Sequence, residues 1–270
     1  MLDRLKALRE AAAPLAGTSK PASRVLPGFV ASLRAARSNA SENSAPADSA
    51  EPRRVAFVAI TRHGIALAGK ARADFPEARL HVPEKLASEA MQVAAGYVSP
   101  YAGKTGDELG RLFHEVDALV VVFSLGALVR LIAPHLRSKT SDPAIVVLDE
   151  AGKFAIPALS GHLGGANALA RRLAAALGAT PVLTTASDVR ETLAVDLLGR
   201  EFGWAIEAEH DILVRASAAV VNEAPVALVQ EAGSPDWWGG HAGGRSLPLP
   251  EHILCFERLE DIDPQSFEAV

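Results

Sequence analysis

Short apolar runs alternate with helical patterns through the middle of the chain. The runs are 54–60, 117–123, 144–148 and 181–183. Continuous runs of this kind with β-branched residues are typical of strands that are buried on both faces of a parallel sheet. Apolar residues recur at helical spacing in the segments 64–74, 105–115, 125–136, 166–177 and 191–202. The alternation predicts an α/β fold, with an open and mainly parallel sheet flanked by helices.

The pattern weakens on both sides of this region. Residues 1–52 hold leucines at helical spacing and then a stretch rich in Ser, Ala, Asn and Pro, which predicts a disordered or loosely helical extension and linker. An organellar transit peptide is an alternative, although the acidic residues near the start favour a flexible extension. The main α/β domain is expected at 53–203. Shorter apolar pieces predict a second, small α+β domain at 204–270.

Composition excludes several function classes. A net charge of −5 and an aromatic content of 5% argue against a nucleic-acid partner. No apolar run approaches the ~20 residues that cross a bilayer, so no membrane partner is expected. Cys255 is the single cysteine, which excludes an internal disulfide framework and a multi-cysteine metal site. We expect a soluble, cytoplasmic protein without a metal site of its own.

Polar clusters follow the apolar runs directly. They lie at 61–64, 124–126, 149–150 and 184–188. In open α/β sheets, ligands bind beyond the carboxyl ends of the parallel strands. We therefore expect these clusters to meet at one edge of the sheet and to form one site there.

A glycine-rich loop before the 166–177 helical pattern carries the strongest candidate chemistry. The loop contains Ser160, Gly161, His162, Gly164, Gly165 and Asn167. Glycines let a backbone approach a ligand closely, and free N–H groups at the start of a helix attract anions. A histidine exchanges a proton near neutral pH. The alternative is a tight turn whose glycines serve backbone geometry alone.

A second cluster contains cations. Ser124 is placed to cap a helix at whose start Gly126 exposes N–H groups, with Arg130 one turn further on and Lys139 in the returning loop. This arrangement predicts a clamp for carboxylate or phosphate groups. A capped helix with a solvated cation is the alternative interpretation.

Two carboxylates complete the candidate set. Asp149 and Asp188 each follow an apolar run, so either one is placed to orient His162 or to act as a general base. A plain turn at Asp149 and a helix cap at Asp188 are the alternatives. The nucleotide-binding signatures G-x-x-x-x-G-K-[ST] and strand-linked G-x-G-x-x-G do not occur in the sequence.

Five motifs in order resemble one family. They are LGALVRLIAP at 125–134, Lys139 with Asp142-Pro143, VVLDEAGKF at 146–154, LSGHLGGAN at 159–167 and PVLTTASD at 181–188. Together they closely resemble the cobalt-precorrin-5A hydrolases of cobalamin biosynthesis, the CbiG family. The resemblance is most specific at 53–203, and residues 204–265 resemble the middle domain of the family. The family commonly has Ala-Thr-Gly-Ile where this chain has 124–127 as Ser-Leu-Gly-Ala.

The resemblance implies a substrate and a reaction. The substrate is a cobalt-bearing corrin precursor with many carboxylates, so cobalt comes with the substrate and no separate cofactor is expected. Water opens a δ-lactone and a two-carbon fragment leaves as acetaldehyde. Because the family's C-terminal domain has no counterpart in these 270 residues, we expect a separate partner to supply it. The alternative is a non-catalytic module that passes a corrinoid intermediate to a precorrin-3B C17-methyltransferase.

The chemistry of the residues then assigns roles. We expect His162 to be the general acid and base, with Asp149 or Asp188 as its orienting carboxylate. We expect the substrate-binding residues to line one cleft with it: Gly126, Arg130, Lys139, Ser160, Gly161, Gly164, Gly165, Asn167 and Thr185.

Overall fold

The computed structural model of the protein divides into two compact units. It describes residues 32–35, 52, 54–138, 141–186, 192–199, 204–232 and 249–270. One unit spans Ser49–Thr185, and the other comprises Met1–Asp48 together with Ala186–Val270. The division after Thr185 lies earlier in the chain than the boundary at 203 that the sequence pattern predicts.

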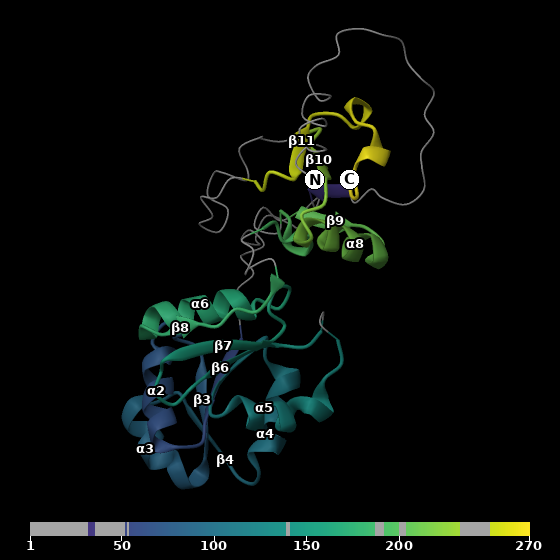
Figure 1. Ribbon diagram of the computed structural model, residues 1–270. Coiled ribbons are helices and arrows are strands. Elements are labelled where there is room, and N and C mark those ends of the chain that lie inside the picture. Colours follow the sequence, from purple (N-terminus) through teal and green to yellow (C-terminus); the bar gives the residue numbers. More distant parts are fainter. Residues whose placement is uncertain are drawn as a thin grey trace, which may run out of the picture. The chain divides into compact units, whose positions relative to one another are not determined.

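A seven-stranded sheet forms the centre of the first unit, in the order β4-β3-β2-β5-β6-β7-β8 (Figure 1). The strands are β2 (Val55–Ala59), β3 (Arg79–Pro83), β4 (Val98–Tyr101), β5 (Ala118–Val122), β6 (Ala144–Leu148), β7 (Phe154–Leu159) and β8 (Thr180–Pro181). Strands β2 to β6 are mutually parallel, as expected for this class of sheet. Strand β7 runs antiparallel to β6, and β8 is parallel to β7. The predicted open, mainly parallel α/β sheet is confirmed.

Helices cover both faces of this sheet. They are α2 (Arg62–Arg72), α3 (Ala87–Val93), α4 (Thr105–Glu115), α5 (Leu125–Ile132) and α6 (Ala166–Leu177), with short 3₁₀ turns at Glu84–Leu86 and Ala133–His135. Helices α2, α3 and α6 pack on one face, and α4 and α5 pack on the other. In Figure 1, α2 and α3 lie on one side of the strands and α4 and α5 on the opposite side.

Alternation along each strand explains the two layers. In β2, Phe57 packs under α2 while its neighbour Val58 packs under α4 and α5, and both are fully buried. Burial of such a side chain contributes about 1.5–3 kcal/mol to stability. Because β2, β5 and β6 are buried along their whole length, their sequences are continuously apolar, which is why the sequence pattern finds them.

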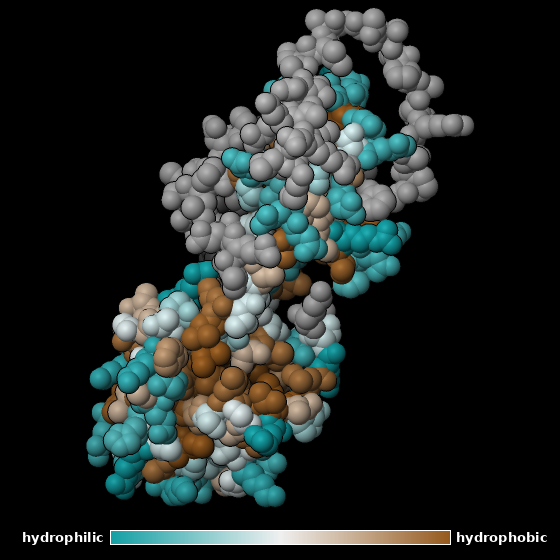
Figure 2. Space-filling model, in the orientation of Figure 1, coloured by the Kyte–Doolittle hydropathy of each residue, from teal (hydrophilic) through white to brown (hydrophobic). Residues whose placement is uncertain are grey.

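One exposed area of this unit is apolar. Figure 2 shows hydrophobic residues gathered over β7 and α5 on the face in view. Val129 on α5 is 53% exposed and Leu125 is 39% exposed. Ile156 and Ala158 on β7 are only partly buried. An apolar surface therefore accompanies the strand that leads into the glycine-rich loop.

The second unit contains two small sheets. Strand β1 (Ser32–Ala35) pairs antiparallel with β9 (Trp204–Glu207), and β10 (Val226–Val229) pairs parallel with β11 (Ile253–Phe256). Helix α8 is His210–Val221, and 3₁₀ turns occur at Val195–Leu197, Leu259–Asp261 and Pro264–Ser266. The prediction of a disordered or helical start is wrong at β1, because these four residues gain backbone hydrogen bonds from a strand about 170 positions later.

The sequence pattern also missed elements. It did not identify β3, β4, β7 or α3, and the helix expected at 191–202 is a 3₁₀ turn at Val195–Leu197 within the described residues 192–199. No helix in the described parts of the chain combines the length and the apolar character that a membrane span requires.

Candidate functional site

The direction of β7 divides the expected site residues between two edges of the sheet. Leu148 of β6 lies opposite Ala155, whereas Ile145 lies opposite Leu159. The carboxyl end of β7 therefore lies at the amino ends of the parallel strands. At about 3.3 Å per residue, the six-residue strand separates its two ends by roughly 16–20 Å. The expectation that the catalytic and substrate-binding residues all line one cleft is wrong for this reason.

Gly126 and Arg130 lie at the carboxyl edge. Ser124 caps α5 by accepting a hydrogen bond from the Ala127 N–H at 3.4 Å. The Arg130 guanidinium is exposed and folds back over the first turn, where its Nη1 donates to the Gly126 carbonyl at 2.7 Å. The structure therefore has the helix cap and the exposed cation that both interpretations of this cluster share. The cation is accessible to an anionic ligand.

Asp149 is a turn residue. Its Oδ1 accepts a hydrogen bond from the Phe154 N–H at 2.7 Å, and its carbonyl accepts from the Gly152 N–H at 2.9 Å. These bonds close the hairpin between β6 and β7. The expectation that Asp149 orients His162 is wrong, because the hairpin and the loop lie at opposite ends of β7.

The carboxyl edge also contains the polar cluster 61–64, which the sequence placed at this edge without assigning it individual site residues. The direction of chain connections reverses between β2 and β5, which makes this the point where ligands bind in open α/β sheets. There Thr61 caps α2 by accepting from the Gly64 N–H at 3.0 Å and donates a short hydrogen bond to Glu150. A side chain on Gly64 would lie 3.1 Å from the Val122 carbonyl oxygen. The polar run 61–64 was visible in the sequence, but only the strand order identifies its position as the crossover.

The Ser160–Asn167 loop lies at the amino edge and has a tightly determined backbone. Ser160 has a φ of +53°, a conformation that is uncommon for residues other than glycine, and its Oγ donates to the Asp142 carbonyl at 2.9 Å. A Cβ on Gly164 would lie 2.4 Å from the Cβ of Ser160, and one on Gly161 would lie 2.7 Å from Oδ1 of Asn167. Both glycines are therefore required by space.

The first N–H groups of α6 donate hydrogen bonds to carbonyls of the loop itself. The Ala166 N–H donates to the Ser160 carbonyl at 3.1 Å, and the Asn167 N–H donates to the Gly161 carbonyl at 2.9 Å. Gly165, with a φ of +85°, precedes the helix. Two of the donors expected to hold substrate carboxylates are thus already bonded, which favours the interpretation of these glycines as determinants of loop geometry.

Asn167 joins the loop to the strand-end segment that follows β8. Its buried side chain donates from Nδ2 to Oγ1 of Thr185 at 2.8 Å. The structure therefore brings together the expected residues Ser160, Gly161, His162, Gly164, Gly165, Asn167 and Thr185. Lys139 and Asp188 lie outside the described residues.

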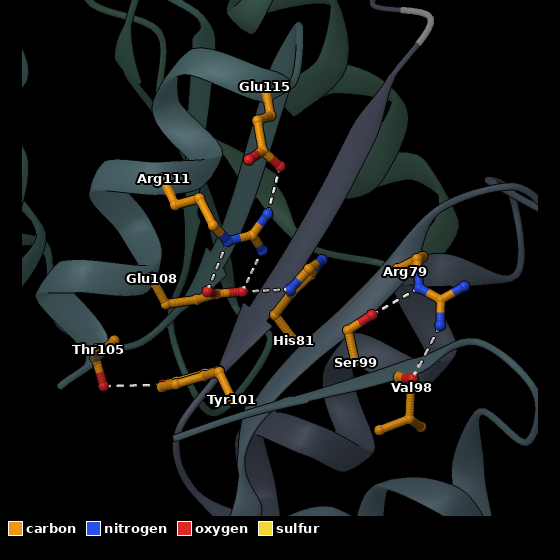
Figure 3. Close-up of polar contacts among 9 residues, drawn as sticks. All are labelled: Arg79, His81, Val98, Ser99, Tyr101, Thr105, Glu108, Arg111 and Glu115. Atoms are coloured by element: carbon orange, nitrogen blue, oxygen red, sulfur yellow. Dashed lines mark hydrogen bonds and ion pairs between the residues drawn. The ribbon is translucent and has the colours of Figure 1, made fainter. Parts of the chain in front are cut away.

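A third polar group lies under α4 and was not singled out from the sequence. His81 of β3 is 6% exposed, and its Nδ1 lies 2.7 Å from Oε1 of Glu108 on α4. Arg111, one turn later, donates from Nη2 and Nε to the two oxygens of Glu108 at 2.7 and 3.0 Å, and its Nη1 pairs with Glu115. Figure 3 shows this chain of contacts from His81 through Glu108 to Arg111.

The electrostatics of this group follow from its burial and its pairs. Burial lowers the pKa of His81 and outweighs the opposing effect of Glu108. Burial by itself would raise the pKa of Glu108, but the hydrogen bonds from Arg111 and His81 hold that pKa below its ordinary value. The hydrogen bond to Glu108 raises the pKa of Arg111. The group is therefore a neutral imidazole beside an ionised carboxylate that a guanidinium holds by two hydrogen bonds.

Across the described residues, no three His, Cys, Asp or Glu side chains gather closely enough to hold a metal ion.

The fold and these edges define a doubly wound α/β protein, and comparison with known proteins identifies its family. Residues 107–188 match the family model Cobalamin synthesis G N-terminal, and residues 193–241 match Cobalamin biosynthesis central region. These consecutive matches place the chain in the CbiG family, of which it carries the N-terminal and central regions. The division between the two matches lies close to the division between the two structural units.

Curated relatives agree with this placement. The chain is 44% identical over 205 residues to a cobalt-precorrin-5A hydrolase of Priestia megaterium, a match that covers 76% of this chain and 53% of the relative. It is 42% identical over 148 residues to a cobalt-precorrin-5A hydrolase of Salmonella typhimurium, covering 55% of this chain and 40% of the relative. The chain thus spans about half the length of the curated relatives it matches.

A crystal structure described as that of a cobalamin biosynthesis protein G homologue from Sulfolobus solfataricus is also similar. The sequence identity is 24% and the TM-score is 0.38, with coverage of 74% of this chain and 52% of that one.

Proposed function

We propose that this chain acts in cobalamin biosynthesis, in the hydrolysis of cobalt-precorrin-5A. In this reaction water opens the δ-lactone of the substrate and acetaldehyde is released. The observation that carries the proposal is the 44% identity, sustained over 205 residues, to a protein named cobalt-precorrin-5A hydrolase. The cobalt belongs to the substrate, and no further cofactor is part of the proposal.

The Ser160–Asn167 loop is the proposed centre of the chemistry. Its backbone is held by the Ser160–Asp142 bond at one end and by the Asn167–Thr185 bond at the other, so a group on the loop has a defined position. His162 is the residue of this loop that can transfer a proton near neutral pH. The partly buried apolar residues of β7 lead to the loop and supply a surface for the carbon skeleton of a large ligand.

The other expected residues take separate roles in this proposal. Arg130 lies at the opposite edge and is assigned to substrate carboxylates that do not take part in the reaction. Lys139 and Asp188 remain the proposed cation and orienting carboxylate of the loop, and Asp149 has no catalytic role because it closes the hairpin.

The reaction also needs water to be excluded and a developing oxyanion to be stabilised. Because the loop's own carbonyls use two of the helix N–H donors, we propose that the family's C-terminal region completes the oxyanion site. The 270-residue chain is then expected to bind the corrinoid and to turn it over slowly unless that region is added as a second protein. Transfer of the intermediate to a precorrin-3B C17-methyltransferase, without hydrolysis, is the competing outcome.

Acetaldehyde release tests the proposal. The purified chain is given cobalt-precorrin-5A, with and without the family's C-terminal region, and acetaldehyde and corrinoid binding are measured separately. We expect binding in both conditions and a rate at least tenfold higher with the added region. Binding without acetaldehyde in either condition would support transfer to the methyltransferase. Absence of both would overturn the proposed function.

Variants locate the chemistry. We expect His162→Ala to lower the rate about 100-fold or more, the usual contribution of a general acid or base, while corrinoid binding changes little. His114→Ala is the matched control, because His114 is an exposed histidine of α4 that is not in the loop. Equal turnover by His162→Ala and His114→Ala would make His162 a turn residue only.

A further inference from the structure

A cavity of about 750 Å³ lies within the first unit, far from the glycine-rich loop along the sheet. It is bounded by β2, β3, β4, α4 and the 74–78 segment. The strands β2, β5 and β6 separate β3 from β7, which at about 4.8 Å per strand gives a distance of about 19 Å. Cavities of 300–1,000 Å³ are the usual size of small-molecule sites. The cavity therefore needs its own explanation, independent of the proposed function.

Buried His81 lines this cavity and has a defined hydrogen-bonding state. An ionised carboxylate can only accept hydrogen bonds, and Arg111 keeps Glu108 ionised, so Nδ1 of His81 must carry the proton that is shared with Glu108. Burial keeps the ring neutral. Nε2 is then an acceptor, and no hydrogen bond to it occurs among the described residues. Because His81 lines the cavity, this acceptor is available to a ligand that carries a donor.

Arg79 provides a cation on the same face. It precedes His81 by two positions in β3, so the two side chains leave the same face of the strand, with Cα atoms about 7 Å apart. Its Nε donates to Oγ of Ser99 at 2.6 Å, and its Nη2 donates to the Val98 carbonyl at 3.2 Å. Within the described parts of the chain it has no acidic partner. Figure 3 shows the His81 ring with Glu108 on one side and Arg79 on the other.

The remaining charges of the cavity limit what it can hold. Asp74, Glu77 and Glu115 also line it, together with Arg54, which is paired with Asp117, and Arg172, whose guanidinium lies over the Phe75 ring. The three carboxylates offset these two cations, so the site suits a ligand with a single negative charge. A single carboxylate matches the guanidinium of Arg79, and a hydroxyl group matches the acceptor on His81. The phenol of Tyr101 lines the same space but is already bonded to Thr105 at 2.9 Å.

We propose that this cavity binds a small hydroxycarboxylate, with the carboxylate on Arg79 and the hydroxyl group donating to Nε2 of His81. Glu108 and Arg111 act as positioning residues, because they fix the tautomer of His81 and do not touch the ligand. The Arg111–Glu108–His81 chain therefore makes the site selective for a ligand that carries a hydroxyl group. A carboxylate without one lacks the hydrogen bond to Nε2 and is held by Arg79 alone.

Binding of 4-hydroxybutyrate to the purified 270-residue chain, followed by the ring signals of His81 in NMR, tests this proposal. Butyrate is the matched probe that lacks the hydroxyl group. We expect 4-hydroxybutyrate to saturate the site and butyrate to bind at least fivefold more weakly. We also expect the ring nitrogens of the free chain to show a protonated Nδ1. A protonated Nε2, or equal binding of the two probes, would overturn the assignment of His81.

Variants test the two contacts separately. Arg79 is exposed, so Arg79→Gln should keep the fold, and we expect it to weaken 4-hydroxybutyrate at least tenfold. Arg62→Gln is the control, because Arg62 is an exposed arginine of α2 that pairs with Glu89 outside the cavity. In His81→Asn the preference for 4-hydroxybutyrate over butyrate should disappear. Unchanged binding in Arg79→Gln, or no saturable binding to the wild-type chain, would overturn the proposal, whatever acetaldehyde assays show.

Discussion

The Ser160–Asn167 loop and the His81–Glu108–Arg111 cluster lie in the same unit and are held by different forces. In the loop, backbone carbonyls and N–H groups bond to one another, and two glycines leave no room for a side chain. In the cluster, three charged or polar side chains from β3 and α4 bond to one another above a buried sheet. The loop therefore depends on backbone shape, and the cluster depends on charge and burial. Substitutions that separate these two causes test the difference.

The largest effect is expected in the loop. Gly164→Ala places a Cβ 2.4 Å from the Cβ of Ser160 and 2.8 Å from its carbonyl oxygen, so the backbone must move. We expect a loss of about 2–3 kcal/mol in the free energy of unfolding of the first unit, measured by denaturant titration.

Gly126→Ala is the control for that substitution. The nearest atom to a Cβ at Gly126 is the flexible Nη1 of Arg130, at 3.4 Å, and the site is helical. Alanine there should be neutral or stabilise by up to about 1 kcal/mol. Equal effects of the two alanines would show that the loop is not held by close packing of its backbone.

This difference also explains what the sequence could and could not predict. A backbone that requires glycine leaves its requirement in the local sequence, so the loop was identified from Gly161, Gly164 and Gly165. The buried strands β2, β5 and β6 were identified in the same way from their continuous apolar runs. Both signals are local, and neither depends on the order of strands in the sheet.

The local sequence signals did not predict contacts between residues that lie far apart in the chain. The hairpin at Asp149 reverses β7, and that one reversal carries the loop to the opposite edge from Arg130. The turn-forming residues 149–152 indicate this reversal in the sequence. The sequence alone does not decide between a turn at Asp149 and a role for Asp149 as an orienting carboxylate. His81 stands alone between apolar residues, and its partner Glu108 lies 27 positions later on a helix. Only the packing of α4 on the sheet reveals that they form a pair.

The second largest effect is expected at Glu108. Glu108→Gln removes the charge that accepts hydrogen bonds from both His81 and Arg111, while the side-chain shape is kept. Because the Glu108 side chain is only 10% exposed, water replaces these bonds only in part. We expect a loss of about 1.5–3 kcal/mol in the free energy of unfolding at pH 7. A loss below about 0.5 kcal/mol would contradict a charge-dependent cluster.

The cluster should also make stability depend on pH. Burial sets the folded-state pKa of His81 below the ordinary 6.5, against the opposing effect of Glu108 and with help from Arg111 and Arg79. As the pH falls through 6.5, the unfolded chain binds a proton at this residue before the folded chain does, so stability falls. The lowered pKa of Glu108 adds a further loss below the ordinary 4.5. Denaturant titrations at pH 7 and pH 5 should show a smaller acid-induced loss in His81→Asn than in the wild-type chain. An equal loss in both would mean that His81 is already charged in the folded state.

The smallest effect is expected at Glu115, which pairs with the same guanidinium as Glu108. The Glu115 side chain is 53% exposed, compared with 10% for Glu108, and it lies one turn beyond Arg111 on α4. Exposed pairs of this spacing contribute about 0.3–0.5 kcal/mol, and salt screens them. Glu115→Gln should therefore cost no more than about 0.5 kcal/mol at low salt, and this cost should vanish near 1 M salt, whereas most of the Glu108→Gln cost should remain. Because the two carboxylates share one arginine, the ratio of their effects measures burial with the cation held constant. If both substitutions cost the same, the two hydrogen bonds between Arg111 and Glu108 contribute no more to the free energy of unfolding than the exposed pair with Glu115. The neutral state of His81 must then depend on burial alone.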